Sequence, residues 1–129
     1  MPLNTAVISF GSNINPEANI LKAKEILGQR YSIIRESSFT YTRPIGLTNQ
    51  PDFLNGAVLI QTDLTSDLLK KSLTEIENTL GRDRTTPKFG PRTIDLDIVV
   101  WNNQVIDQDF YLRPFLRDAV LEILPDLIY

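Results

Sequence analysis

Apolar and polar side chains alternate along several segments of the chain, and this period of two predicts β-strands. The alternation is clearest over 93–101, where apolar residues stand at every second position from Ile94 to Val100. Three more apolar segments are bounded by Gly, Pro or Asn, which is typical of strand ends. The remaining predicted strands are 3–13, 31–42, 53–62 and a short strand after a turn within 101–107.

Two other segments carry apolar residues three or four positions apart, which is the spacing of one face of an α-helix. The first, 15–30, begins with Asn15 as its N-cap residue, and Gly28 is its expected end. The second, 65–81, has the more regular apolar stripe and ends in a glycine. A last short helix is expected over 113–124, with a proline near its start.

The predicted elements follow the order strand, helix, strand, strand, helix, strand, with a short C-terminal extension. This order defines a ferredoxin-like α+β fold, in which an antiparallel sheet carries both main helices on one face. No repeat, low-complexity stretch or linker interrupts it, so residues 1–129 are expected to form a single domain. Because this fold hosts many functions, the function has to be inferred from the site.

Composition restricts the chemistry that the chain can use. The 129 residues are 42% hydrophobic and 22% charged, which is ordinary for a globular protein, and neither Cys nor His occurs. Their absence removes disulfides, thiolate metal sites, most zinc sites and the commonest general base. Any catalysis must therefore depend on carboxylates, Arg, Lys, backbone amides or a bound metal.

Charge and hydropathy argue against two classes of partner. The formal net charge of −3 does not favour nucleic-acid binding, which usually needs a basic surface. No apolar run approaches the roughly 20 residues that span a bilayer, and no signal peptide is recognisable. We therefore expect a cytoplasmic protein with no membrane or nucleic-acid partner, and a monomer with a dimer as the alternative.

Asp95 and Asp97 stand out in the predicted strand 93–101, because they share one face and lie roughly 7 Å apart. An antiparallel sheet often has one solvated face, where two aspartates need no function. Asp is nevertheless depleted in strands, and two close carboxylates repel each other unless a cation lies between them. Mg²⁺ is usually held by one or two carboxylates together with substrate phosphates. The pair is therefore a candidate Mg²⁺ site, with the solvated face as the alternative.

The loop 82–92, directly before this strand, is rich in cations. It contains Arg82, Arg84, Lys88 and Arg92 against a single acid. A solvated surface loop would account for these cations by itself. Next to two carboxylates, however, they suit a polyphosphate that is shared between Arg side chains and Mg²⁺. The sequence has no Gly-rich phosphate-binding loop, so such a ligand would depend on side-chain cations and metal.

A third candidate site surrounds the loop 43–52. Phe53 and Asn55 follow this loop and share one face of the predicted strand. An aromatic ring beside an amide can hold a flat heterocycle by stacking and by paired hydrogen bonds. The alternative is that Phe53 belongs to the core and that Asn55 closes a turn.

Five short motifs stand in the order and spacing of a known family: GSN at 11–13, SSFTYTRPIG at 37–46, QPDFLNGAV at 50–58, IENTLGRDR at 76–84 and GPRTIDLDI at 90–98. Over roughly residues 5–107 the chain resembles 6-hydroxymethyl-7,8-dihydropterin pyrophosphokinase, an enzyme family of folate synthesis. The resemblance implies a ferredoxin-like fold. It also implies transfer of pyrophosphate from ATP to the hydroxymethyl group of the pterin, with release of AMP and with two Mg²⁺ ions as cofactors.

Carried over by position, the resemblance implies roles for individual residues. It implies that Asp95 and Asp97 bind both Mg²⁺ ions, and that they act in catalysis together with Arg82 and Arg92. The implied ATP-binding residues are Glu77, Arg82, Arg84, Lys88, Arg92 and Ile98. The implied pterin-binding residues are Gly11, Thr42, Pro44, Ile45, Phe53, Asn55 and Asp95.

The C-terminal part departs from the family pattern. The family usually has a longer segment here that carries a histidine, whereas this chain is shorter and has Phe115 after Pro114. Arg113 and Arg117 are both candidates to replace the missing cation, and the sequence does not distinguish them. Phe89 also stands where a tryptophan is frequent in the family.

These departures leave three hypotheses open. The first is an active pyrophosphokinase of the folate pathway, with ATP and a hydroxymethyl-dihydropterin as substrates. The second is a diverged relative that modifies another pterin, or that binds pterin and nucleotide with little turnover. The third is a ferredoxin-like module with an RNA-binding or regulatory role, which the net negative charge disfavours.

Overall fold

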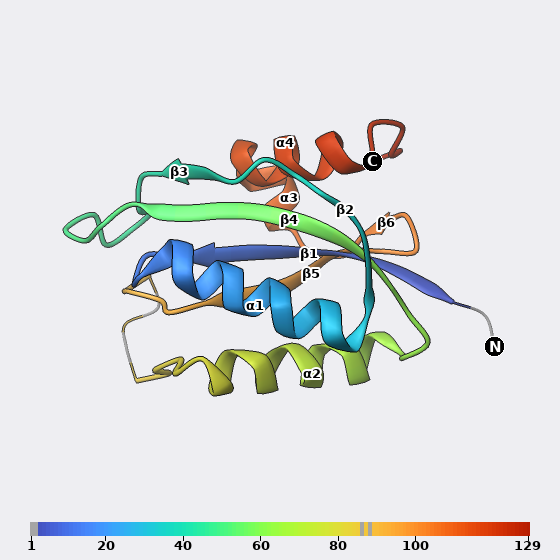
Figure 1. The fold of residues 1–129 in the computed structure, drawn as a ribbon. Coiled ribbons are helices and arrows are strands. Elements are labelled where there is room, and N and C mark those ends of the chain that lie inside the picture. The colour runs from blue at the N-terminus through green and yellow to red at the C-terminus, as the bar shows by residue number, and fades with distance from the viewer. Residues whose placement is uncertain (1–2, 86, 88) are drawn as a thin grey trace.

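The structure is a computed structural model that describes residues 3–85, 87 and 89–129. The elements follow one another along the chain in the order β1-α1-β2-β3-β4-α2-β5-β6-α3-α4 (Figure 1). The strands are β1 (Asn4–Ser12), β2 (Ser32–Glu36), β3 (Thr40–Thr42), β4 (Phe53–Thr62), β5 (Asp95–Trp101) and β6 (Gln104–Val105). The helices are α1 (Pro16–Arg30), α2 (Ser66–Thr79), α3 (Asp109–Leu112) and α4 (Pro114–Ile123).

The strands form one antiparallel sheet in the order β2-β4-β1-β5-β6, and β3 also pairs with β4. Figure 1 shows α1 and α2 on one face of this sheet, and α3 and α4 on the other. The α+β class and the antiparallel sheet with helices packed on it are therefore confirmed. Within the described residues, no helix is both long enough and apolar enough to span a membrane.

Each face of the sheet has its own hydrophobic core, because neighbouring residues of a strand point to opposite faces. On one face, Ile8 and Phe10 of β1 pack with buried residues of α1 and α2. On the other face, Val7 packs with Phe110 of α3 and with buried residues of α4 such as Val120. The C-terminal extension is thus part of the folded unit, since it covers a sheet face that would otherwise expose apolar side chains.

The helices follow their sequence signals with two differences. Helix α2 begins after Thr65, whose side chain accepts a hydrogen bond from a backbone N–H of the first turn. Asn15 precedes α1 with a left-handed φ of 42°, and its side chain makes no capping hydrogen bond. Gly28 does not end α1, which continues to Arg30. The last turn is held by contacts with α2, because the guanidinium of Arg30 donates to the hydroxyl of Ser72 at 2.9 Å.

The predicted strand 31–42 is divided into β2 and β3. At Ser37 the backbone N–H donates to the carbonyl of Ala57 at 2.9 Å, while the Ser37 hydroxyl accepts from the N–H of Ala57 at 2.8 Å. Phe39 then packs over Gly56, where an added Cβ atom would lie 2.5 Å from the ring. This interruption places β3, and Thr42 at its end, beside the first residues of β4.

Candidate active site

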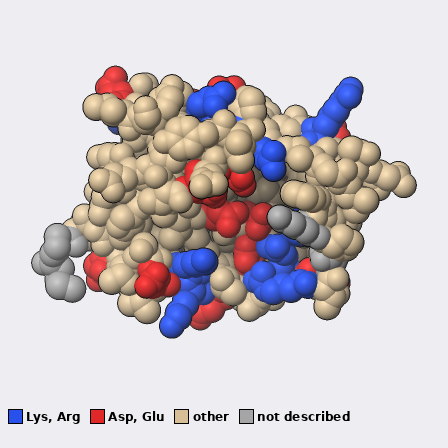
Figure 2. Space-filling view, turned by 180° about the vertical axis from the view of Figure 1, so that it is seen from behind, with Lys and Arg blue, Asp and Glu red and all other residues tan. Residues whose placement is uncertain are grey.

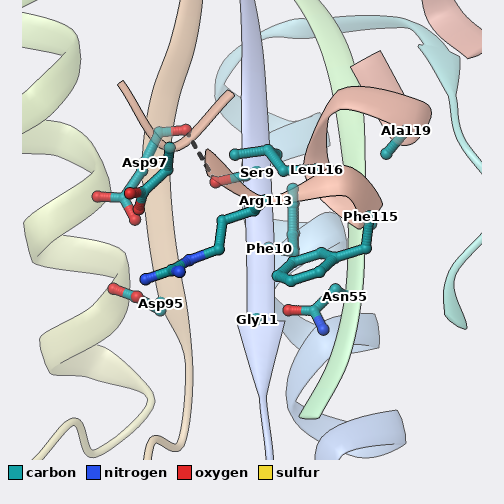
Figure 3. Close-up of a pocket in the computed structure, with 12 residues that line it drawn as sticks. Ser9, Phe10, Gly11, Asn55, Asp95, Asp97, Arg113, Phe115, Leu116 and Ala119 are labelled. Atoms are coloured by element: carbon teal, nitrogen blue, oxygen red, sulfur yellow. Dashed lines mark hydrogen bonds between the residues drawn. The ribbon is translucent and has the colours of Figure 1, made fainter. Parts of the chain in front are cut away.

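The aspartate pair on β5 and the side-chain amide of Asn55 on β4 lie on the two strands that flank β1. In the ladder between β1 and β5, Asp95 is opposite Gly11 and Asp97 is opposite Ser9. In the ladder between β1 and β4, Gly11 is opposite Asn55. Asp95, Gly11 and Asn55 therefore form one row across three strands, with Asp95 and Asn55 on either side of β1 (Figure 3).

Three hollows meet at this row, and Asp95 lines all of them. The helix-side hollow, of about 840 Å³, lies along α2 and β5. The loop-side hollow, of about 270 Å³, is lined by residues of the loops 43–52 and 82–92. The central hollow, of about 120 Å³, lies over β1 between Asp95 and Asn55. Figure 2 shows this side of the molecule, where acidic side chains gather in the centre with Lys and Arg around them.

The helix-side hollow brings together most residues of the predicted ATP site. Its lining includes Glu77, Arg82, Arg84, Asp95, Asp97 and Ile98. Arg92 instead lines the loop-side hollow, where its guanidinium donates to backbone carbonyls of its own loop, including Gly90 at 3.0 Å. Lys88, which the sequence also assigns to ATP, lies outside the described residues.

Glu77 joins α2 to the carboxylate strand through a network of hydrogen bonds. One of its carboxylate oxygens accepts from the guanidinium of Arg82 at 3.1 Å and from the backbone N–H of Leu96 at 2.8 Å. The other accepts from Arg84 at 2.9 Å. The same nitrogen of Arg82 also lies 3.0 Å from a carboxylate oxygen of Asp95. Since Glu77 and Arg82 are largely buried, this network fixes the position of Asp95.

The loop-side hollow contains most residues of the predicted pterin site. Its lining includes Thr42, Ile45, Phe53 and Asn55, with the rings of Phe89 and Phe115. Asn55 lies inside β4 and donates to the hydroxyl of Thr42, so it does not close a turn. Phe53 is half-buried and lines this hollow, so it is not a core residue. Pro44 is buried, and it is not among the residues that line the three hollows.

Gly11 leaves room for the amide of Asn55 in the middle of the row. A Cβ atom on Gly11 would lie 3.1 Å from the side-chain oxygen of Asn55, which is closer than most real contacts of this kind. The GSN motif thus has a steric role in this site, because a larger residue would push Asn55 away from the central hollow. The sequence indicated a role for Gly11 only through the family resemblance, which assigns it to the pterin site.

Asp97 occupies an electrostatically unfavourable position. Asp97 is exposed at the edge of the cleft, but the surrounding protein still displaces part of its water, and this is the largest cause that raises the pKa of its carboxyl. The negative charges of Asp95, Asp107 and Glu77 raise the pKa further. Arg82 acts in the opposite direction but does not compensate, so the pKa is raised to about 7. A pocket with this much uncompensated negative charge suits a bound cation.

The donor set of the aspartate pair fits Mg²⁺, which prefers oxygen ligands. Among the described residues, no group of three or more His, Cys, Asp or Glu is placed to hold a metal ion on its own. Asp95 and Asp97 can therefore provide only part of a coordination shell. Phosphate oxygens and water would have to complete it, which is the usual arrangement for Mg²⁺.

We expect Asp97→Asn to raise the melting temperature of the metal-free protein at pH 8, and to raise it less at pH 5. The carboxyl binds its proton more tightly in the folded protein, with a pKa of about 7, than at its ordinary pKa of 3.8 in the unfolded chain. The cost of ionising the folded protein therefore grows as the pH rises from 4 to 7 and stays constant above that. Asn carries no charge at any of these pH values.

Thermal melts with a chelator present, at both pH values, would measure this difference. The control is Asp118→Asn, which changes an exposed aspartate of α4 that is not among the residues lining the three hollows. The control should show no pH-dependent gain. A gain of equal size at pH 5 and pH 8, or a loss at pH 8, would contradict the raised pKa of Asp97.

The structure distinguishes the two C-terminal arginines that the sequence left open. Arg113 connects α3 to α4 in an extended conformation and lines the central and loop-side hollows. Figure 3 shows its guanidinium group extending toward Asp95. Arg117 instead donates to the backbone carbonyl of Tyr111 at 3.3 Å and is not among the residues that line the three hollows. Arg113 is therefore the C-terminal cation of this cleft.

Asp109 and Phe115 are further residues of the cleft that sequence analysis did not assign to the site. Asp109 begins α3 and lines all three hollows. Phe115 lines the central and loop-side hollows, and Figure 3 shows its ring near Asn55. Phe115 had a weak signal, since it follows Pro114 where the family pattern changes. Asp109 had none, because a single acid in an irregular segment has no periodicity.

The fold and the cleft together define a class of protein. It is an α+β domain whose cleft has aspartates at its centre and arginines around them, and this cleft joins the helix-side hollow to the loop-side hollow. The chain belongs to the 7,8-dihydro-6-hydroxymethylpterin-pyrophosphokinase (HPPK) family, whose family model matches residues 7–125. This confirms the resemblance on which the sequence analysis depended. The match also extends past the motifs and includes the shortened C-terminal segment.

Three curated relatives named 2-amino-4-hydroxy-6-hydroxymethyldihydropteridine pyrophosphokinase support the same assignment. The protein of Haemophilus influenzae is 34% identical over 135 residues, which cover 96% of this chain and 84% of the relative. That of Bacillus subtilis is 37% identical over 117 residues, covering 88% and 70%. That of Methylorubrum extorquens is 36% identical over 137 residues, covering 98% and 86%.

Proposed function

We propose that this protein transfers the pyrophosphoryl group of ATP to the hydroxymethyl group of 6-hydroxymethyl-7,8-dihydropterin, releasing AMP, as a step of folate biosynthesis. Family membership supports the class of reaction. The observation that carries the proposal is the row formed by Asp95, Gly11 and Asn55, which joins the helix-side hollow to the loop-side hollow. Two substrates in these hollows would meet at the aspartate pair.

The helix-side hollow is proposed to take ATP. Its volume of about 840 Å³ lies within the range of small-molecule sites, roughly 300–1,000 Å³. Asp95 and Asp97 would hold Mg²⁺, which when bound neutralises charge on the triphosphate. Arg84 lines the helix-side hollow and Arg113 lines the central hollow, and each can contact phosphate oxygens. Arg82 supports the pair from within the wall, through its contact with Asp95.

The loop-side hollow is proposed to take the pterin. The rings of Phe53 and Phe115 provide apolar faces for a flat bicyclic ring, and aromatic stacking adds to the area that they bury. Asn55 can donate and accept at the polar edge of the heterocycle, with Thr42 orienting its amide. The hydroxymethyl group would then point to Asp95, at the junction of the hollows.

In the proposed step, the oxygen of the hydroxymethyl group attacks the β-phosphorus of ATP in line with the leaving group. A new O–P bond forms, and the bond from the β-phosphorus to the bridging oxygen of the α-phosphate breaks, so AMP leaves with that oxygen. We assign acceptance of the hydroxyl proton to Asp97, whose carboxylate lines the helix-side and central hollows. The chain mainly positions groups and offsets charge, as is usual for phosphoryl transfer.

Release of AMP tests the proposal directly. The purified protein is incubated with Mg²⁺ and ATP, with and without 6-hydroxymethyl-7,8-dihydropterin, and the nucleotides are separated by chromatography. We expect AMP to appear only with the pterin, in a one-to-one ratio with pyrophosphorylated pterin. No AMP in either sample, or AMP that forms equally without pterin, would overturn the proposal.

A second candidate is a relative that binds pterin and nucleotide with little turnover. The observation in its favour is Asp109, an additional carboxylate that lines all three hollows and would repel a triphosphate. Calorimetry separates the two candidates, because tight binding of both ligands without AMP release supports only the second. For either candidate we infer that residues 1–129 act as one domain, since a single sheet carries both hydrophobic cores.

A further inference from the structure

We propose that Asn13 is a positioning residue that couples the loop-side hollow to Arg92, so that binding of the pterin and binding of the nucleotide strengthen each other. The proposal rests on the proposed function and extends it to a residue with no assigned role. Asn13 follows β1, is only 4% exposed and lines none of the three hollows described above. Its influence on the substrates must therefore act through other residues.

Asn13 first fixes the backbone of Arg92. The backbone N–H of Asn13 donates to the carbonyl of Arg92 at 3.0 Å, and the Asn13 side-chain oxygen accepts from the backbone N–H of Arg92 at 2.8 Å. Both backbone groups of Arg92 are thus bound to one residue. Arg92 lines the loop-side hollow and stands three positions before Asp95, so this contact sets where the cationic loop enters β5.

Asn13 also holds the other loop. Its side-chain nitrogen donates to the side-chain oxygen of Gln50 at 2.8 Å and to the backbone carbonyl of Pro51 at 3.0 Å. The buried amide therefore uses its oxygen for the loop 82–92 and both its hydrogens for the loop 43–52. A buried amide with all these partners is held firmly, because an unsatisfied buried donor is unfavourable.

Gln50 adds a second connection between the two loops. Its side-chain nitrogen donates to the carbonyl of Leu47 in its own loop and to the carbonyl of Phe89 in the other. The ring of Phe89 also packs against Gly46, where φ is +82° and an added Cβ atom would lie 2.7 Å from the ring. The loops thus contact each other through a hydrogen bond and through close packing.

These contacts matter for binding because both loops line the same hollow. Ile45 comes from one loop, and Phe89 and Arg92 come from the other. A pterin that orders one loop there would order the other through Asn13 and Gln50. It would thereby also order Arg92, which the family resemblance assigns to ATP. Such coupling between two ligands is reciprocal, and a typical factor is about 5–150-fold in affinity. We expect the pterin to raise the affinity for a Mg²⁺–ATP analogue by a factor in this range.

Asn13→Asp removes the side-chain contacts of residue 13 with the loop 43–52 and keeps its contact with the loop 82–92. An aspartate has nearly the same shape and can still accept the hydrogen bond from Arg92, but it has no donor for Gln50 or Pro51. Gln50→Ala removes the second connection and one acceptor of the Asn13 amide, and leaves the contacts of Asn13 with Pro51 and Arg92 in place. The matched control is Asn49→Ala, which changes the neighbouring exposed residue of the same loop.

Isothermal titration calorimetry of the full chain tests the proposal, with an unhydrolysable Mg²⁺–ATP analogue titrated with and without the pterin. In Asn13→Asp and Gln50→Ala the coupling factor should fall below about 3-fold, while the affinity for each ligand alone stays within about 3-fold of the original protein. Asn49→Ala should keep the full coupling. A merely structural role would instead weaken both separate affinities. Unchanged coupling in both variants, or no coupling in the original protein, would overturn the proposal.

A second measurement keeps this inference separate from the proposed function. Amide hydrogen exchange of the ligand-free protein reports how firmly residues 89–92 are held. Exchange at the Arg92 amide should be faster in Gln50→Ala than in Asn49→Ala. In Asn13→Asp this amide keeps a carboxylate acceptor, so its exchange should be no faster than in Asn49→Ala. If the protein binds neither ligand, the proposed function fails, and unchanged exchange at Arg92 in Gln50→Ala would reject the connection through Asn13 as well.

Discussion

Asp97→Ala is expected to lower the rate of AMP release by about 10³-fold or more, the largest effect of any substitution considered for this protein. A tenfold change in rate corresponds to about 1.4 kcal/mol, so this loss corresponds to roughly 4 kcal/mol of transition-state stabilisation. Asp97 lines the helix-side and central hollows and carries one of the two carboxylates proposed to hold Mg²⁺. Without it, charge that develops on the transferred group is less well offset.

Variants of Asp97 allow loss of activity to be distinguished from loss of folding. Most losses of activity can be explained by poor folding, but the raised pKa of Asp97 means that its charge destabilises the metal-free protein at neutral pH. The variant Asp97→Asn should therefore melt at a higher temperature and still be nearly inactive. The control Asp118→Ala, on the exposed side of α4, should keep its rate within about twofold. An Asp97→Ala protein with more than a tenth of the original rate would remove Asp97 from the mechanism.

The shared face of Asp95 and Asp97 could be predicted from the sequence, because it depends only on the alternation of side chains along one strand. Alternation along 93–101 places Asp95 and Asp97 on one face wherever that strand lies in the sheet. The structure adds the neighbours: the antiparallel ladders set Gly11 beside Asp95 and Asn55 beside Gly11. The order of strands in the sheet has no local signal, so the sequence could link these motifs only through the family resemblance.

For Glu77, the local sequence pattern predicts burial but does not identify the partners of the carboxylate. It lies among the apolar positions of α2, between Leu73 and Leu80, so helical periodicity places it on the buried face. A buried carboxylate needs charged or hydrogen-bonding partners. Its partners Arg82 and Arg84 come from the irregular segment after the helix, and their conformation follows from tertiary contacts alone. Only the family resemblance implied an acid near the nucleotide, and neither the resemblance nor periodicity indicated that this acid holds Arg82 against Asp95.

The C-terminal segment was the least predictable part of the site. Its position is set by the packing of Leu116, Val120 and Ile123 against the sheet face opposite to α1 and α2. This packing fixes the direction of α4 and therefore which arginine reaches the cleft. Sequence periodicity predicted the helix itself, but the shortened segment left no motif from which to choose between Arg113 and Arg117.

Arg113→Ala is expected to lower kcat/KM for the proposed reaction by about 10²–10³-fold, the size of loss typical for one group that stabilises transition-state charge. Its guanidinium reaches the central hollow beside Asp95 and is the only arginine there among the described residues. Arg113→Lys should recover part of the activity, because a lysine keeps the charge but cannot form two parallel hydrogen bonds to phosphate. Arg117→Ala is the matched control and should stay within about threefold.

A double variant that also changes Asp109 tests more directly whether the positive charge of Arg113 acts on the phosphates. In Arg113→Ala the carboxylate of Asp109 would face the triphosphate without a compensating cation, so part of the lost activity reflects repulsion and not only a missing contact. Asp109→Asn alone should leave kcat/KM within about twofold, because Arg113 compensates the charge of Asp109 in the original protein. Adding Asp109→Asn to Arg113→Ala should recover about tenfold, an interaction energy of about 1.4 kcal/mol between the two sites. Kinetics of both single variants and the double variant would measure it. Purely additive effects, or a loss in Arg117→Ala as large as that in Arg113→Ala, would show that Arg113 does not act on the phosphates.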